Sequence, residues 1–170
     1  MSEQYFSAQP SSAHSESAFD YAYRGHALRF VTDAGVFSRG EMDRGTDTLL
    51  SALHELSGRV LDLGCGYGTI GVSAAKAFPD CEMVMTDVNE RAAALAKRNA
   101  EKNGVAAEVL TGDGFERVAG DFDVILTNPP IRAGKQVIYR LFAESAARLN
   151  AGGRLFLVIR KQQGADSAVK

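Results

Sequence analysis

Residues 60–68 read Val-Leu-Asp-Leu-Gly-Cys-Gly-Tyr-Gly, and no other stretch says as much about the architecture of the chain. A short apolar run ends in three alternating glycines, and a helical pattern follows over residues 69–78. Glycine has no Cβ and tolerates a positive φ, so such a turn lets a ligand approach the backbone closely. Gly66, Gly68 and Gly71 also match the dinucleotide pattern Gly-x-Gly-x-x-Gly, which leaves the kind of ligand open.

Strand and helix patterns alternate on both sides of this turn. Strands that alternate with helices form right-handed βαβ units, with parallel strands and helices on both faces of the sheet. We therefore predict an α/β protein with a doubly wound, mostly parallel sheet, which from residue 59 onward reaches about five strands. The expected strands are 27–32, 59–63, 82–86, 107–110, 122–127 and 154–159, and the expected helices are 44–56, 69–78, 89–103 and 137–149.

Composition and charge narrow the class of protein. Residues 1–18 are rich in Ser, Gln and Ala and predict a flexible N-terminal arm, followed by one domain over residues 19–170. The net charge of −2 gives no global basic field for nucleic acid, although a local patch remains possible. No stretch approaches the ~20 apolar residues of a membrane span. Cys65 and Cys81 lack metal-ligand spacing, so we expect a cytoplasmic protein with reduced thiols and without a metal or membrane partner.

Three aspartates accompany the predicted ligand edge of the sheet. Asp62 lies inside the strand before the glycine turn, where a carboxylate would favour an ammonium group and would do nothing for a pyrophosphate. Asp87 ends the next strand, 19 residues beyond Gly68, which is the spacing of an acid that binds ribose hydroxyls. Asp113, in Gly-Asp-Gly, suits an adenine amino group, and a turn or helix N-cap explains it equally well.

A second loop, Asn128-Pro129-Pro130-Ile131, follows the strand expected over residues 122–127. Two prolines fix φ twice and restrict Asn128, so the loop is rigid. The Asn128 amide oxygen and the Pro129 carbonyl can then accept from a planar –NH2 group and aim its lone pair at a sulfonium methyl, a reaction that depends mainly on positioning. A stiff turn explains this loop alone, but its combination with Asp62, Asp87 and the glycine turn favours methyl transfer to an amino nitrogen.

These motifs resemble class I S-adenosylmethionine-dependent methyltransferases that act on amino nitrogens. Within this class the chain is similar to the small-subunit ribosomal RNA guanine-N2 methyltransferases, in the single-domain form of the methyltransferase small domain family. The similarity covers most of residues 20–163, and includes residues 32–38, 43–46, 87–91 and 131–135.

The resemblance implies a Rossmann-like fold, S-adenosyl-L-methionine as cofactor and guanine N2 of small-subunit ribosomal RNA as acceptor, with the base flipped into the pocket. The implied catalytic residues are Asn128 and Pro129. The implied cofactor contacts are Asp62, Gly64, Cys65, Gly66, Gly68, Asp87, Val88, Asp113, Gly114 and Asn128. The implied substrate contacts are Phe37, Pro130, Ile131, Arg132 and Lys135.

The sequence also departs from the family pattern. Many relatives have an aromatic residue where this chain has Ile131, and the usual sheet has seven strands, so its C-terminal strands are expected to be missing or the chain to be shortened. Two alternatives stay open: an N5-methyltransferase for a protein glutamine amide, and a cofactor- or RNA-binding module without turnover. Arg132 and Lys135 are candidates for phosphate contacts, with solvated surface charge as the alternative. The oligomeric state is not predicted.

Overall fold

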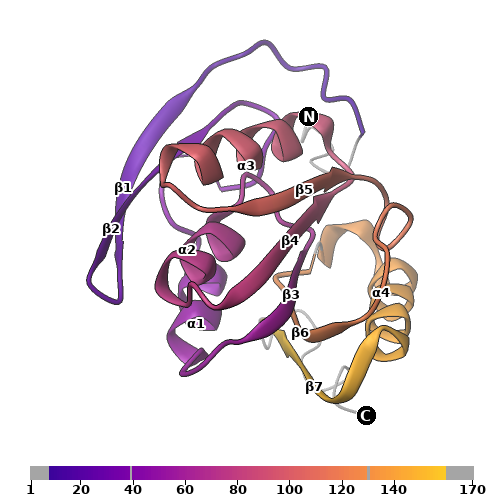
Figure 1. Ribbon diagram of the computed structural model, residues 1–170. Helices are drawn as coiled ribbons and strands as arrows, with labels where there is room; N and C mark the ends of the chain where they lie inside the picture. The colour runs from indigo at the N-terminus through magenta and orange to yellow at the C-terminus, as the bar shows by residue number, and fades with distance from the viewer. Residues whose placement is uncertain (1–7, 39, 130, 160–170) are drawn as a thin grey trace.

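The computed structural model describes residues 8–38, 40–129 and 131–159, apart from the side chain of Ile131. Its centre is a parallel five-stranded sheet with the strand order β5-β4-β3-β6-β7 (Figure 1). The predicted doubly wound α/β fold is confirmed. The strands are β3 (Gly58–Leu63), β4 (Cys81–Asp87), β5 (Ala107–Thr111), β6 (Phe122–Thr127) and β7 (Leu149–Leu157).

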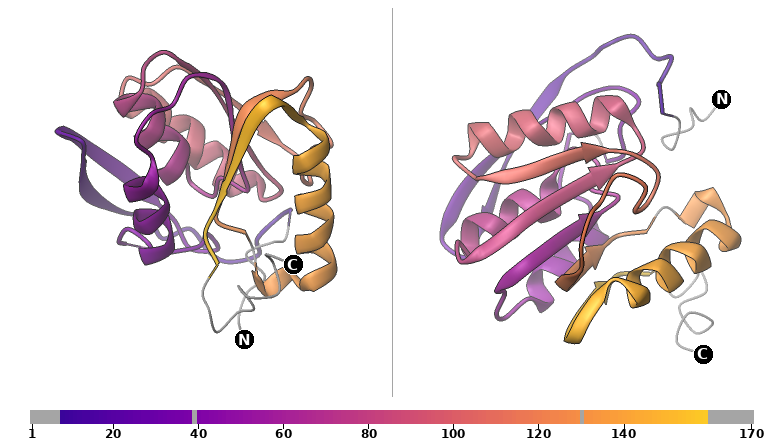
Figure 2. Two further views of the ribbon diagram at one scale, coloured as in Figure 1. Left: turned by 90° about the horizontal axis from the view of Figure 1, so that it is seen from below. Right: turned by 45° about the vertical axis from the view of Figure 1, so that its right-hand side comes forward.

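Helices cover both faces of this sheet, as predicted (Figure 2). One face carries α1 (Arg44–Ala52), α2 (Thr69–Ala77) and α3 (Glu90–Lys102), whose apolar residues form one core with alternate strand residues such as Val60 and Met85. The other face carries α4 (Lys135–Ala147), which follows the short 3-10 helix η1 (Ile131–Ala133) and packs over Leu61 and Ile125. Successive strand residues point to opposite faces of the sheet. Because helices cover both faces, the strand residues on both sides are apolar. None of the helices in the described ranges is long and apolar enough to cross a membrane.

The chain order places a cleft at one edge of the sheet. From β3 the chain moves outward through β4 to β5, and it then returns to the other side of β3 to form β6 and β7. The loops that follow β3 and β6 therefore leave the carboxyl edge in opposite directions. Ligands of open α/β sheets bind at such a switch point.

An N-terminal hairpin packs against α2 and α3 (Figure 1). Its strands are β1 (Ser17–Tyr23) and β2 (His26–Thr32), which pair antiparallel through a two-residue turn. Arg24 and Gly25 both have positive φ there, +47° and +81°, as a tight hairpin turn requires. The sequence predicted β2 but not β1, although the alternating aromatic residues before Arg24-Gly25 are a hairpin signal.

Residues 8–18 make hydrogen bonds to the rest of the domain, and the flexibility of the expected N-terminal arm stays a prediction. The Ala8 carbonyl accepts from the Glu90 N–H at 3.0 Å, and Arg91 donates to the Ser12 carbonyl at 2.9 Å. The Ser15 N–H donates to buried Asp33 at 2.5 Å. A polar composition predicted flexibility, whereas α3 and Asp33 supply partners for these polar backbone groups. The first seven residues of the expected arm lie outside the described part.

Two element boundaries differ from the prediction by four residues or more, the end of α1 and the start of β7. α1 ends at Ala52 instead of Leu56, because the chain becomes extended at Leu53 while Leu53 and Leu56 stay buried in the core. β7 begins at Leu149, well before the expected start, and its pairing with β6 shifts register between Phe122 and Val124. Apolar periodicity therefore located the buried residues correctly and their helical limits less well.

Candidate active site

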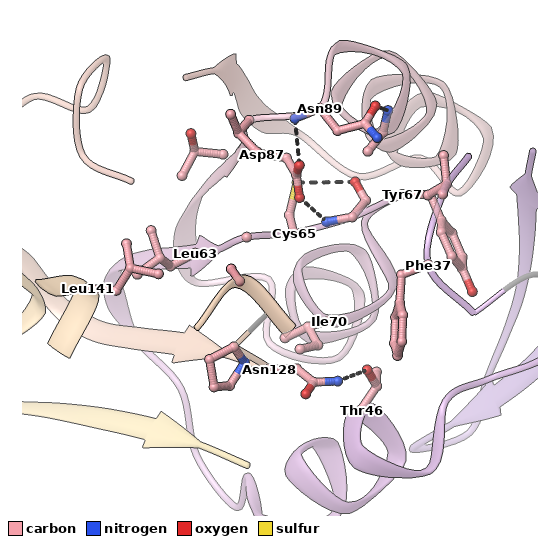
Figure 3. Close-up of a pocket in the computed structure, with 18 of the residues that line it drawn as sticks. Phe37, Thr46, Leu63, Cys65, Tyr67, Ile70, Asp87, Asn89, Asn128 and Leu141 are labelled. Atoms are coloured by element: carbon pink, nitrogen blue, oxygen red, sulfur yellow. Dashed lines mark hydrogen bonds between the residues drawn. The ribbon is translucent and has the colours of Figure 1, made fainter. Parts of the chain in front are cut away.

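A cavity of about 620 Å³ opens at the carboxyl edge of β3, β4 and β6 (Figure 3). Its walls also include the start of α1 and part of α4. This size suits a ligand of cofactor dimensions. The residues expected from the sequence that line it are Phe37, Gly64, Cys65, Gly66, Asp87, Val88, Asp113, Gly114, Asn128, Pro129 and Arg132.

Along the glycine turn, main-chain atoms form the wall. The Gly64 and Cys65 N–H groups both donate to the Thr86 carbonyl of β4 at 2.9 Å. The φ angles are +71° at Gly64 and +56° at Gly66, and a Cβ at either position would meet no atom within 4 Å. A side chain would strain the turn and extend into the space a ligand needs. The open main-chain face fits a cofactor that lies directly against the turn.

Gly68 differs from the other two glycines of the turn. It does not line the cavity, and a Cβ there would lie 3.2 Å from both Cα and Cβ of Ala96 in α3. Its own φ is +94°, and its N–H donates to the Cys65 carbonyl at 2.9 Å. The missing side chain therefore lets α2 begin close to α3, and the expected cofactor contact at Gly68 stays a prediction.

Asp87 lies at the end of β4, on the cavity wall. Its Oδ2 accepts from the Gly66 N–H and its Oδ1 from the Asn89 N–H, both at 2.8 Å (Figure 3). Burial raises the pKa of this carboxyl, and the N–H donors offset part of the increase. The remaining lone pairs of the fixed carboxylate suit the two hydroxyl groups of a ribose, which is the role the sequence predicts.

Asp62 lies beneath the glycine turn and does not line the cavity. Its Oδ2 accepts from the Gly71 N–H of α2 at 2.8 Å, while Oδ1 is buried without a hydrogen-bond partner among the described residues. Burial raises the pKa of this carboxyl to about 7, and the nearby Asp87 adds to the increase. Asp62 therefore supports the turn from below, through α2, and its expected contact with a methionine ammonium group stays a prediction.

Asn128 lies at the opposite end of the cavity from Asp87 (Figure 3). Its Nδ2 donates to Asp43 Oδ2 at 2.9 Å and contacts Thr46 Oγ1 at 3.4 Å. Pro129 lines the cavity next to it. This arrangement is compatible with the predicted acceptor site, in which the amide oxygen and the Pro129 carbonyl accept from a planar amino group.

Asp43 and Thr46 were not among the residues singled out for a role in the site. Asp43 is the N-cap of α1, where its Oδ2 accepts from the Thr46 N–H at 3.0 Å. An Asp three residues before a Thr is a recognisable helix start. The contact with Asn128 spans 85 residues of sequence, so no local pattern indicates it.

Phe37 lies on the side of the cavity that also carries Tyr67 and Thr46 (Figure 3). Its side chain is 50% exposed, which is high for a phenylalanine and fits a wall that a substrate would cover. The next residue, Ser38, has a φ of +54°, and its carbonyl accepts from the Tyr67 hydroxyl at 2.8 Å. Tyr67 therefore connects the glycine turn to the segment that carries Phe37.

Asp113 and Gly114 line the cavity near α4. The Asp113 carboxylate accepts from Arg140 Nη2 at 2.7 Å, and its side chain is half exposed. The predicted adenine contact would share this carboxylate with Arg140. Contact between Asp113 and adenine stays a prediction.

The remaining expected residues divide into three groups. Exposed Arg132 lines the cavity, whereas Lys135, at the start of α4, does not. Pro130 and the side chain of Ile131 lie outside the described part. Burial raises the pKa of the Cys65 thiol well above its ordinary value, so this thiol is poorly suited to act as a nucleophile. Within the described ranges, no three His, Cys, Asp or Glu side chains gather as a metal site.

The comparison with known families agrees with this geometry. The model of the methyltransferase small domain matches residues 27–170. The chain belongs to the methyltransferase small domain family. Methyltransferases of this family use S-adenosylmethionine.

Individual relatives extend the comparison. The chain is 45% identical to an uncharacterized Bacillus subtilis protein, YbxB, over 100% of this chain and 87% of that protein. It is 42% identical to ribosomal RNA small subunit methyltransferase C of Pasteurella multocida, over 77% of this chain and 42% of that protein. The chain therefore spans less than half the length of that relative.

A solved structure resembles the fold closely. The Thermus thermophilus 16S rRNA N2 G1207 methyltransferase, in complex with AdoMet and guanosine, superposes with a TM-score of 0.77 and 31% identity. The match covers 84% of this chain and 41% of that one. The methyltransferase small domain therefore corresponds to one part of a longer enzyme in that case.

Proposed function

We propose that this methyltransferase transfers a methyl group from S-adenosylmethionine to an exocyclic amino group, namely guanine N2 of small-subunit ribosomal RNA in the cytoplasm. The observation that carries the proposal is the orientation of the Asn128 amide. Its Nδ2 donates to Asp43 at 2.9 Å, so its oxygen is the atom that can accept a hydrogen bond from the amino group of the substrate. The relatives named above support the choice of RNA, because a 31% identical enzyme acts on N2 of a 16S rRNA guanosine.

Residues at one end of the cavity would bind the cofactor, and residues at the other end would orient the amino group. Asp87 would bind the ribose of the cofactor and the glycine turn its methionine end. When bound, S-adenosylmethionine would supply an electrophilic methyl group from its sulfonium sulfur, which would keep the C–S electron pair, and the methylated nitrogen would release a proton to water. Asn128 and the Pro129 carbonyl would accept from the two amino hydrogens and orient the lone pair. Catalysis by positioning then needs no strong general base.

Arg132 gives some support for a polyanionic acceptor, because it is exposed and lines the same cavity. Phosphate contacts by such side chains position nucleic acid without reading its sequence. We propose Phe37 as the surface on which the flipped base packs. Pro130, Ile131 and Lys135, which are close in sequence to Arg132, are proposed as further substrate contacts.

The substrate class is tested by transfer of radiolabelled methyl groups to two acceptors in parallel. One is small ribosomal subunits that lack the modification, and the other is a peptide release factor with an unmodified glutamine. We expect label in the RNA only, and loss of that label in Asn128→Ala. Label in the release factor would instead indicate a glutamine methyltransferase, and label in neither acceptor, with cofactor bound, would indicate a binding module.

A further inference from the structure

We propose that Asp43 is a positioning residue for methyl transfer, because its carboxylate determines which way the Asn128 amide faces. This inference rests on the proposed function, in which the Asn128 oxygen accepts from the reacting amine. Both residues line the cavity, and they come from different elements, the start of α1 and the loop after β6.

The first step of the argument is chemical. A carboxylate oxygen only accepts hydrogen bonds, and of the two ends of an amide only the nitrogen donates. With Asp43 Oδ2 at 2.9 Å, Asn128 must present Nδ2 to it, because a flipped amide would place oxygen against oxygen. The Thr46 hydroxyl, 3.4 Å from the same nitrogen, either donates or accepts and cannot impose this choice alone.

The second step is steric. A Cβ at Gly45 would lie 2.9 Å from Asp43 Oδ2 and 3.3 Å from Asn128 Nδ2. The absence of a side chain at residue 45 therefore leaves room for the carboxylate and the amide to meet. The same Oδ2 also accepts from the Thr46 N–H at 3.0 Å, so the space at residue 45 serves the helix cap and the contact with Asn128 together.

The third step concerns charge. In the proposed reaction, positive charge moves from the cofactor sulfur toward the acceptor nitrogen. A carboxylate beside Asn128 lies on the acceptor side of the cavity and favours that movement, and its field acts without reorganisation during the reaction. Asp43 would thus assist in two ways, by orientation and by charge.

The substitution that isolates this role is Asp43→Ser. Serine is as good an N-cap as aspartate but is too short to reach Asn128. We expect kcat to fall about tenfold to a hundredfold, the effect of losing a hydrogen bond to a charged group, while the Kd for S-adenosylmethionine stays within about twofold. Asp47→Ser is the matched control: it removes an exposed carboxylate from the same helix turn and should leave kcat unchanged.

A double-mutant cycle distinguishes positioning from a structural role. In the Asn128→Ala background, Asp43→Ser should lower the residual kcat much less than it does in the wild type, because the amide that Asp43 orients is gone and only the effect of its charge remains. Independent, multiplying effects would overturn the inference, and so would an Asp43→Ser enzyme of normal kcat beside an inactive Asn128→Ala enzyme. Normal transfer by Asn128→Ala would instead contradict the proposed function itself.

A readout without turnover completes the test. The side-chain NH2 resonances of Asn128, followed by 15N NMR, should shift in Asp43→Ser and stay unchanged in Asp47→Ser. If Asp43→Ser does not fold, Asp43→Thr is a second short N-cap residue that leaves Asn128 Nδ2 without the carboxylate. An Asp43→Thr enzyme with unchanged resonances and unchanged kcat would overturn the inference.

Discussion

At the scale of single residues, two buried carboxyl groups beside the cofactor cavity have different roles. Asp87 is fixed by two N–H donors on the cavity wall, so its remaining lone pairs can bind a ribose. Asp62 is enclosed under the turn with one bonded oxygen and one without a partner in the described structure. The first group is arranged for a ligand, and the second supports the loop that binds it.

The raised pKa of Asp62 has a consequence for stability. Its folded-state pKa is about 7, well above the ordinary value of 3.8, so between these pH values the folded protein retains a proton that the unfolded chain has lost. This contribution to the free energy of unfolding is therefore fully present below about pH 4 and is lost as pH rises through about 7, at up to about 1.4 kcal/mol per pH unit.

Asp62→Asn mimics the protonated carboxyl and should remove this dependence. In urea denaturation from pH 5 to 8, the free energy of unfolding of the variant, relative to that of the wild type, should increase as pH rises. The pKa of Asp87 is also raised, so the wild-type slope includes its contribution, and only the difference between the two profiles belongs to Asp62. Parallel profiles would show that Asp62 is ionised in the folded protein.

At the scale of elements, the turn between β3 and α2 is held from three sides. Thr86 of β4 accepts from its first two N–H groups. Asn99 of α3 donates to the Tyr67 carbonyl at 2.8 Å and exchanges two further bonds with the backbone of Val31 in β2. Gly68 lets α3 approach, so the geometry of the turn depends on the packing of α2 against α3.

Gly68→Ala should therefore destabilise the fold and weaken cofactor binding. The positive φ costs about 1 kcal/mol, and contact with the α3 backbone at 3.2 Å adds about 1–3 kcal/mol. Gly25→Ala is the control, because its φ is +81° and a Cβ there would meet nothing within 4 Å. We expect denaturation and calorimetry to show a larger loss of stability for Gly68→Ala, and a loss of affinity in that variant alone. Equal stability losses would contradict the packing role.

At the scale of the whole molecule, sheet topology brings the two ends of the site together. The βαβ alternation, the glycine turn, Asp87 and Asn128 were all readable from the sequence, because each belongs to a local pattern of strand ends and spacings. The pairing of Asp43 with Asn128, the docking of residues 8–16 on α3, and the burial of Asp62 were not, because they depend on which surfaces meet after folding. Long-range contacts between polar groups leave little trace in periodicity.

The same topology places the glycine turn and Asn128 in one cavity. We propose that the cofactor binds at the glycine turn and the amino acceptor at Asn128. The most direct test is to incubate undermethylated small ribosomal subunits with S-adenosylmethionine carrying a 13C methyl group, digest the RNA, and identify the labelled nucleoside by mass spectrometry. Wild-type protein is predicted to yield labelled N2-methylguanosine, and Asn128→Ala to yield none while still binding the cofactor. A label on a ring carbon, on a ribose oxygen or on another base would contradict the account.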